Sequence, residues 1–184
     1  MKVATLALLV ASNQAVDTWE DGPEFEIEWD SHKEAMKIEA EVPEGQWLGI
    51  AYGQNMNNVD MLFMGGNGDG DFKDMWAANP YGGPPDEDPN FSYFDVERKK
   101  EGSKYEFKAW RKLDTGDAAN DLVINCGQVY DFKWVGHDAS GTMNKHNKVG
   151  MWKLTINEDC TMSGAVKLGS LMAAGALSIA AYYL

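Results

Sequence analysis

The stretch from Trp47 to Gly66, WLGIAYGQNMNNVDMLFMGG, contains two apolar segments with a polar turn between them. The first segment ends at Tyr52, and the second begins at Val59. The turn between them holds Gly and Asn, which interrupt regular structure and favour a change of chain direction. Short apolar runs bounded by such residues are typical of β-strands, so this stretch predicts two strands joined by a turn.

Met56 lies at the tip of that turn, where burial alone gives no reason for an apolar side chain. A thioether can fill a gap in the packing, or it can coordinate a soft metal centre such as haem iron. From the turn alone, both interpretations stay open.

The rest of the body shows the alternation expected of strands. In Phe25–Trp29 (FEIEW), apolar and acidic residues alternate, as in a strand with one exposed face. Residues 79–90 are rich in Pro and acids and predict a long irregular loop. Further strands are predicted at residues 36–42, 72–76, 93–97, 105–113, 128–135 and 150–156. Because no long stretch before the C-terminal tail has helical periodicity, we expect an all-β protein, an antiparallel, immunoglobulin-like β-sandwich over residues 16–160.

The N-terminus has the features of a secretory signal peptide. A charged start precedes an apolar run from Val3 to Ala11, and small and polar residues follow up to Ala15. The apolar run is too short to span a bilayer. We therefore expect residues 1–15 to form a signal peptide, with cleavage after Ser12 or after Ala15 equally compatible with the sequence.

The C-terminal tail is also apolar. Residues 168–184, LGSLMAAGALSIAAYYL, are of marginal length for a spanning helix. A small-residue trio, Ser163–Ala165, precedes them, as in the attachment signal of a glycolipid anchor. Residues 161–184 are thus expected to be either a lipid-anchor signal or a single-pass membrane anchor. Both alternatives place the folded body at the extracellular cell surface, reached through the secretory pathway.

The formal net charge is −13. Such an acidic chain argues against binding to nucleic acid and against direct adhesion to anionic lipid. Solubility is the simplest reason for most of these charges.

Two cysteines, Cys126 and Cys160, are expected to form a disulfide, because an oxidising compartment favours the bond. The sequence contains no C-x-x-C-H motif, which excludes covalent c-type haem attachment. Asn90-Phe91-Ser92 is a glycosylation sequon with Asn90 as the acceptor. The disulfide and the sequon both fit a secreted glycoprotein.

Catalytic motifs are scarce in this chain. The three histidines, His32, His137 and His146, lie near no nucleophile elbow and in no metal-ligand spacing. Asn67–Asp71 (NGDGD) resembles the start of a calcium loop but lacks the glycine and the final carboxylate that such a loop needs. A hairpin turn is the better interpretation of this segment. The chain is therefore more easily read as a carrier or binding module than as an enzyme.

Several segments, taken in order, resemble the DOMON family of β-sandwich domains. Each segment is a weak signal alone, but the order and spacing together cover residues 24–157. The matching segments are Trp47–Gly53, Met56–Asn58, Asp60–Met61, the strand with Trp76, Arg111–Asp117, Val129–Gly136 and His146-x-x-x-Gly150.

The resemblance implies a non-covalent haem b held by two axial ligands, Met56 and His146. An imidazole binds both oxidation states of iron, while a thioether favours the ferrous state and raises the potential. With both axial positions filled, such a haem carries electrons rather than activating oxygen. Candidates to neutralise its propionates are Lys145, Lys148 and Arg111. An apolar pocket around the porphyrin would be lined by Tyr52, Met61, Phe63, Met64 and Trp76.

Two functions are compatible with this resemblance. The first is a surface-anchored b-type cytochrome that exchanges single electrons with a redox partner protein or a membrane cytochrome. The second is a haem-free DOMON module that binds carbohydrate or assists surface assembly, since loops rich in Asn, Asp, Trp and Tyr suit sugar stacking.

Overall fold

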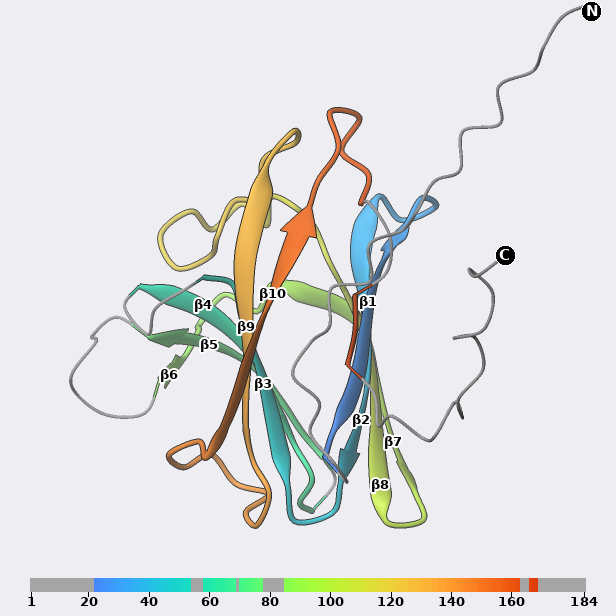
Figure 1. Ribbon diagram of the computed structural model, residues 1–184, viewed down its shortest axis with the longest axis vertical. Coiled ribbons are helices and arrows are strands. Elements are labelled where there is room, and N and C mark those ends of the chain that lie inside the picture. The colour runs from blue at the N-terminus through green and yellow to red at the C-terminus, as the bar shows by residue number, and fades with distance from the viewer. Residues whose placement is uncertain (1–21, 54–57, 69, 78–84, 163–165, 169–184) are drawn as a thin grey trace, which may run out of the picture.

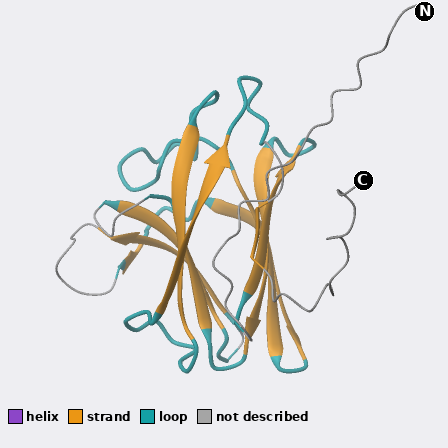
Figure 2. Cartoon of the chain, in the orientation of Figure 1, coloured by secondary structure: helices purple, strands orange, loops and turns teal. Residues whose placement is uncertain are grey.

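Two antiparallel sheets lie face to face in the computed structural model of the chain (Figure 1). The structure describes residues 22–53, 58–68, 70–77, 85–162 and 166–168, the last three by their backbone alone. Strands connected by turns and loops make up these residues, with no helix among them (Figure 2). The all-β sandwich predicted from the sequence is confirmed.

The first sheet has five strands. They are β1 (Glu24–Asp30), β2 (Ala35–Pro43), β7 (Tyr93–Glu101), β8 (Lys104–Arg111) and β11 (Val166–Leu168). Their order across the sheet is β11-β1-β2-β8-β7. Strand β2 lies at the centre and pairs along its length with β1 on one side and β8 on the other.

The second sheet has six strands. They are β3 (Trp47–Ala51), β4 (Val59–Gly65), β5 (Asp71–Ala77), β6 (Asp86–Glu87), β9 (Val129–His137) and β10 (Lys148–Thr155). Their order is β10-β9-β3-β4-β5-β6, so the segment Trp47–Gly66 supplies the two central strands, β3 and β4. The polar turn between these strands reverses the chain, as predicted, because β3 and β4 pair antiparallel.

Two short strands depart from the sequence-based prediction. Asp86–Glu87, expected in an irregular loop, forms β6 beside β5. Val166–Leu168, expected in the anchor segment, forms β11 and pairs with β1, so the sandwich extends past residue 160. The predicted signal peptide and the tail after Leu168 lie outside the described residues. No helix able to cross a bilayer occurs among the residues that the structure describes.

The main core fills the space between the two sheets. Ile27 and Ile38 from the five-stranded sheet and Leu48, Ile50 and Leu62 from the six-stranded sheet have at most 1% of their surface exposed. Aromatic rings join this core edge to face, as when Phe132 meets Trp152 at 5.4 Å between centroids. In β10, Gly150, Trp152 and Leu154 are buried while the residues between them are exposed, as one core face and one solvent face require.

The last strands are linked by a disulfide. Cys126 and Cys160 are bonded, with their Cα atoms 4.7 Å apart. The bond joins the segment before β9 to the turn after β10, where Cys160 N–H also donates to the Asn157 carbonyl at 2.9 Å. The disulfide therefore closes the β9–β10 hairpin at its open end.

Replacing both cysteines by alanine should lower the free energy of unfolding by about 3–4 kcal/mol, because the bond spans 34 residues and restricts the unfolded chain. Urea unfolding followed by tryptophan fluorescence measures this change. Dithiothreitol should bring the wild-type midpoint to that of the double variant and leave the double variant unchanged. Equal midpoints for the untreated proteins would contradict a stabilising bond.

Candidate functional site

A second apolar cluster lies on the outer face of the six-stranded sheet, on the side away from the main core, over β3, β4, β5 and one residue of β9. Every member has at most 6% of its surface exposed. Met143 packs against the cluster from the loop between β9 and β10. We call this set the outer cluster. Its members are Trp47, Ala51, Val59, Met61, Phe63, Met75, Ala77 and Val135.

The outer cluster exists because β3 and β4 are apolar on both faces. All residues of both strands are buried, including Asp60. In β4, Leu62 and Met64 enter the main core, whereas Met61 and Phe63 belong to the outer cluster. An antiparallel sheet with a solvated outer face would alternate apolar and polar residues instead. These two strands therefore predict a second layer on the outer face.

The loop at residues 138–147, which connects β9 to β10, is fixed against one edge of the outer cluster. Trp47 Nε1 donates a hydrogen bond to Asn144 Oδ1 at 3.0 Å. The loop also approaches the sheet closely at Gly65, where an added Cβ would lie 2.7 Å from the Gly141 carbonyl oxygen. Glycine is therefore required at position 65 by the packing of this loop.

His146 is held half-buried near the end of this loop. Its pKa is lowered from the usual value of 6.5, first by burial and then by the positive charges of Lys145 and Lys133. Lys133 lies in β9 directly opposite Ala51, a member of the outer cluster. Within the described part of the chain, no hydrogen bond engages its ring. His146 thus offers a neutral imidazole beside the outer cluster, as an axial metal ligand must.

The other two histidines, His137 and His32, have surroundings that differ from those of His146. His137 Nδ1 accepts a hydrogen bond from the Ala139 N–H at 3.0 Å, which occupies that ring nitrogen at the end of β9. His32 is exposed in the turn between β1 and β2, where its N–H donates to Asp30 Oδ1 at 2.9 Å. His137 lies directly opposite Trp47 of the outer cluster, but the hydrogen bond accepted by Nδ1 places the proton of the neutral ring on Nε2. His32 lies in a turn of the other sheet.

Met56 lies outside the described residues. The strand ends on either side of it, in β3 and β4, are described. Strand β3 ends at Ala51 and β4 begins at Val59, and both residues belong to the outer cluster. The connection that carries Met56 therefore leaves from the outer cluster and returns to it. Met61 is itself a member of the outer cluster.

Tyr52 and Trp76 lie on the other face of the six-stranded sheet. Tyr52 is buried in the main core, where its hydroxyl accepts a hydrogen bond from Tyr93 at 3.0 Å. Trp76 pairs across the strands with Asp60, whose carboxylate points between the sheets. These two residues, together with Met64, do not share the face of Met61 and His146, so they do not line a pocket there.

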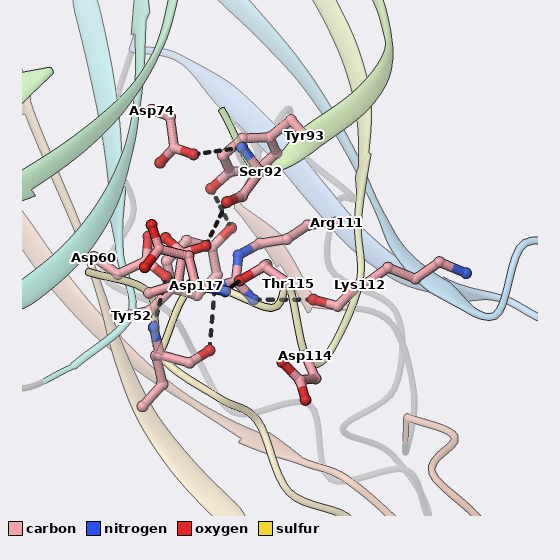
Figure 3. Close-up of polar contacts among 12 residues, drawn as sticks. Tyr52, Asp60, Asp74, Ser92, Tyr93, Arg111, Lys112, Asp114, Thr115 and Asp117 are labelled. Carbon is pink, nitrogen blue, oxygen red and sulfur yellow. Dashed lines mark hydrogen bonds and ion pairs between the residues drawn. The ribbon is translucent and has the colours of Figure 1, made fainter. Parts of the chain in front are cut away.

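A buried polar network links the two sheets through Asp60 of β4 and Arg111 of β8. Figure 3 shows its side chains. Arg111 Nη2 donates to Asp60 Oδ2 at 2.5 Å, and both side chains have at most 1% of their surface exposed. The Leu122 N–H also donates to Asp60 Oδ2, at 3.1 Å. The Arg111 guanidinium lies 4.7 Å from the centroid of the Tyr52 ring. Arg111 is therefore committed to the interior and is not free to neutralise haem propionates on the outer face.

Two acids in this network have raised pKa values. Burial raises the pKa of Asp60 to about 6, although the charge of Arg111 opposes the shift. Burial also raises the pKa of Asp74 to about 7, against the hydrogen bond that it accepts from the Ser92 N–H at 2.8 Å. Sequence reasoning did not identify this network. The available signals were an acid inside an apolar strand at Asp60 and a basic residue ending the strand at Arg111.

The family is now decided by comparison with known proteins. The model of the DOMON domain matches residues 21–137. The chain belongs to the DOMON family. Met56 lies within the matched range and His146 lies beyond its end. The resemblance inferred from the sequence segments is thereby confirmed.

Two solved structures are similar to this DOMON chain. One is the cytochrome domain of cellobiose dehydrogenase from Myriococcum thermophilum, with 16% identity and a TM-score of 0.50 over 74% of this chain and 76% of that one. The other is the cytochrome b domain of pyranose dehydrogenase from Coprinopsis cinerea, with 14% identity and a TM-score of 0.49 over 71% of this chain and 75% of that one. At such identities the likeness shows a shared fold. No curated protein matches the chain in sequence.

Replacing Arg111 by Met should lower the free energy of unfolding by about 3–5 kcal/mol, because it leaves the carboxylate of Asp60 buried without its cation. Chemical denaturation measures the loss. Arg98→Met is the matched control, since Arg98 is exposed and its Nη1 donates to the Gly70 carbonyl at 3.3 Å without a buried acid as partner among the described residues. Similar small losses in both variants would show that the buried pair does not stabilise the fold.

Proposed function

We propose that this DOMON protein is a b-type cytochrome that carries single electrons, with haem seated on the outer cluster between Met56 and His146. The observation that supports the proposal is the outer cluster itself, a buried apolar layer on a sheet face that would otherwise meet solvent. The similar cellobiose dehydrogenase structure is a cytochrome domain, which also supports this function.

The described residues fit a haem group. Porphyrin needs apolar surroundings, and Met61, Phe63 and Trp47 are buried apolar side chains on this face of the sheet. Iron needs a neutral imidazole, and burial together with neighbouring lysines keeps the pKa of His146 low. Bound haem supplies a one-electron couple between ferric and ferrous iron.

The protein residues have separate tasks in this proposal. The Trp47–Asn144 hydrogen bond and the Met143 contact hold the loop of His146 against the sheet and exclude water from that edge. Lys133 and Lys145 place positive charge beside His146, where it can neutralise a propionate. We therefore assign the neutralisation of a propionate to Lys133 rather than to the buried Arg111. Lys148 Nζ is partly engaged by an ion pair with Asp138 Oδ2 at 3.2 Å.

The cellular setting belongs to the same proposal. A signal peptide at residues 1–15 and an anchor after the sandwich would place the cytochrome at the extracellular surface, with Asn90 as a glycan acceptor. There it would exchange electrons with a redox partner protein or a membrane cytochrome. Asn90 is exposed, and its Nδ2 donates to Asp117 Oδ2 at 2.8 Å.

Haem titration and visible spectra test the function. The wild-type protein should take up one haemin and show sharp low-spin bands after reduction with dithionite. Met56→Ala and His146→Ala should each lose those bands and bind haem at least about tenfold more weakly, since each removes an axial ligand.

Two matched controls separate ligand loss from general damage. Asn57→Ala changes the neighbour of Met56 in the sequence, and His32→Ala removes an exposed histidine. Both should keep the wild-type spectrum. A wild-type protein that takes up no haemin would end the cytochrome proposal and leave the carbohydrate-binding module. Unchanged low-spin bands in both alanine variants would end the ligand assignment.

A further inference from the structure

The buried charges of the sandwich do not balance. Among the residues that the structure describes, the buried charged side chains are four acids and one base. Buried charge is stable only when it is paired, protonated or bound to a metal ion. These five buried side chains therefore need additional positive charge inside the fold to be neutral. They are Asp60, Asp74, Asp88, Asp121 and Arg111.

Three of these acids converge from separate parts of the chain. Asp60 comes from β4, Asp74 from the adjacent β5, and Asp121 from the segment after β8. Each offers a carboxylate oxygen that lies within 4.8 Å of the oxygens offered by the other two. Asp60 and Asp74 are only 1% exposed, and Asp121 is 7% exposed.

A second observation is that two oxygens at this point have no partner. Oδ1 of Asp60 and Oδ1 of Asp74 are buried and accept no hydrogen bond from any described residue. Their Oδ2 atoms are occupied, by Arg111 and by the Ser92 N–H respectively. A buried oxygen without a donor costs free energy unless a cation or a proton meets it.

We propose that Asp60, Asp74 and Asp121 bind one Ca²⁺ ion. Calcium coordinates oxygens at 2.3–2.6 Å, so one ion reaches two oxygens about 5 Å apart, whereas Mg²⁺ spans only about 4 Å and requires octahedral geometry. The three carboxylate oxygens lie within 4.8 Å of one another, which is within the reach of one Ca²⁺ ion. Three carboxylates and the Arg111 guanidinium leave two negative charges, which one divalent cation neutralises.

Ser92 connects this site to solvent. Its single O–H can donate to Asp121 Oδ2 or to the Asn90 carbonyl, so Ser92 lies in direct contact with one of the three acids. Ser92 also lines an open surface pocket of about 470 Å³ that includes Asp117. The pocket provides an entrance, and the carboxylate of Asp117 gives it a negative charge that attracts cations.

Terbium luminescence tests the site directly. Tb³⁺ substitutes for Ca²⁺ and is sensitised by nearby aromatic rings, here Tyr52 and Tyr93, which both interact electrostatically with Asp60. Full-length protein freed of metal with EDTA should bind one Tb³⁺ with saturable emission at moderate salt. Ca²⁺ should displace it, and about 5 mM Ca²⁺ should raise the thermal midpoint of unfolding.

Asp74→Asn should weaken Tb³⁺ binding by at least about tenfold and abolish the effect of Ca²⁺ on the thermal midpoint. Asp71→Asn, which changes a partly exposed acid at the start of the same strand, should leave both unchanged. Asp121→Asn provides a second test if Asp74→Asn does not fold. The proposal is overturned if wild-type protein shows no saturable emission, if the Asp71 variant is equally weakened, or if both ligand variants bind as wild type does. The first of these results would mean that protons alone neutralise the acids.

Discussion

Strands β3 and β4 bury side chains on both of their faces, and this constraint organises the molecule. One face must meet the five-stranded sheet, because Leu48, Ile50 and Leu62 have no exposed surface. The other face must also be covered, since Met61 and Phe63 are almost as deeply buried. A two-layer sandwich has no second sheet to offer there. The loop at residues 138–147 lies over part of the outer cluster, through Met143 and Asn144.

The Asp60–Arg111 ion pair fixes which residues of β4 face outward. Asp60 reaches Arg111 in β8 of the opposite sheet, so its side chain must point between the sheets. The next residue, Met61, must then point outward. A slip of one residue would exchange the two faces of a strand, and in β4 it would place the carboxylate of Asp60 in the apolar outer cluster. The pair costs desolvation energy, but it distinguishes two faces that hydrophobicity alone leaves equivalent.

Sequence patterns predicted where most of the strands lie. They did not predict which face of the sheet each side chain of an apolar strand occupies. Alternation in Phe25–Trp29 and the turn residues around Val59–Gly65 marked elements that the structure contains. Strands β6 and β11 were missed because two or three residues carry no periodicity. Tyr52 and Trp76 were expected beside Met61, since a strand that is apolar on both faces gives no signal of which residues point where. The acid network was missed for a different reason: Asp60, Asp74 and Asp121 come together only through the pairing of β4 with β5 and the return of the chain after β8.

The two proposed sites occupy opposite faces of the same strand, which couples them electrostatically. Asp60 and Met61 are consecutive in β4, one in the acid network and one in the outer cluster. Two unit charges about 10 Å apart interact by roughly 1–2 kcal/mol at an effective dielectric constant near 20. Uncompensated carboxylates behind the sheet would therefore favour the more positive, oxidised state of a redox centre on the outer face. A cation or protons in the network would remove that bias, so the charge state of the interior would set part of the potential of the proposed redox centre.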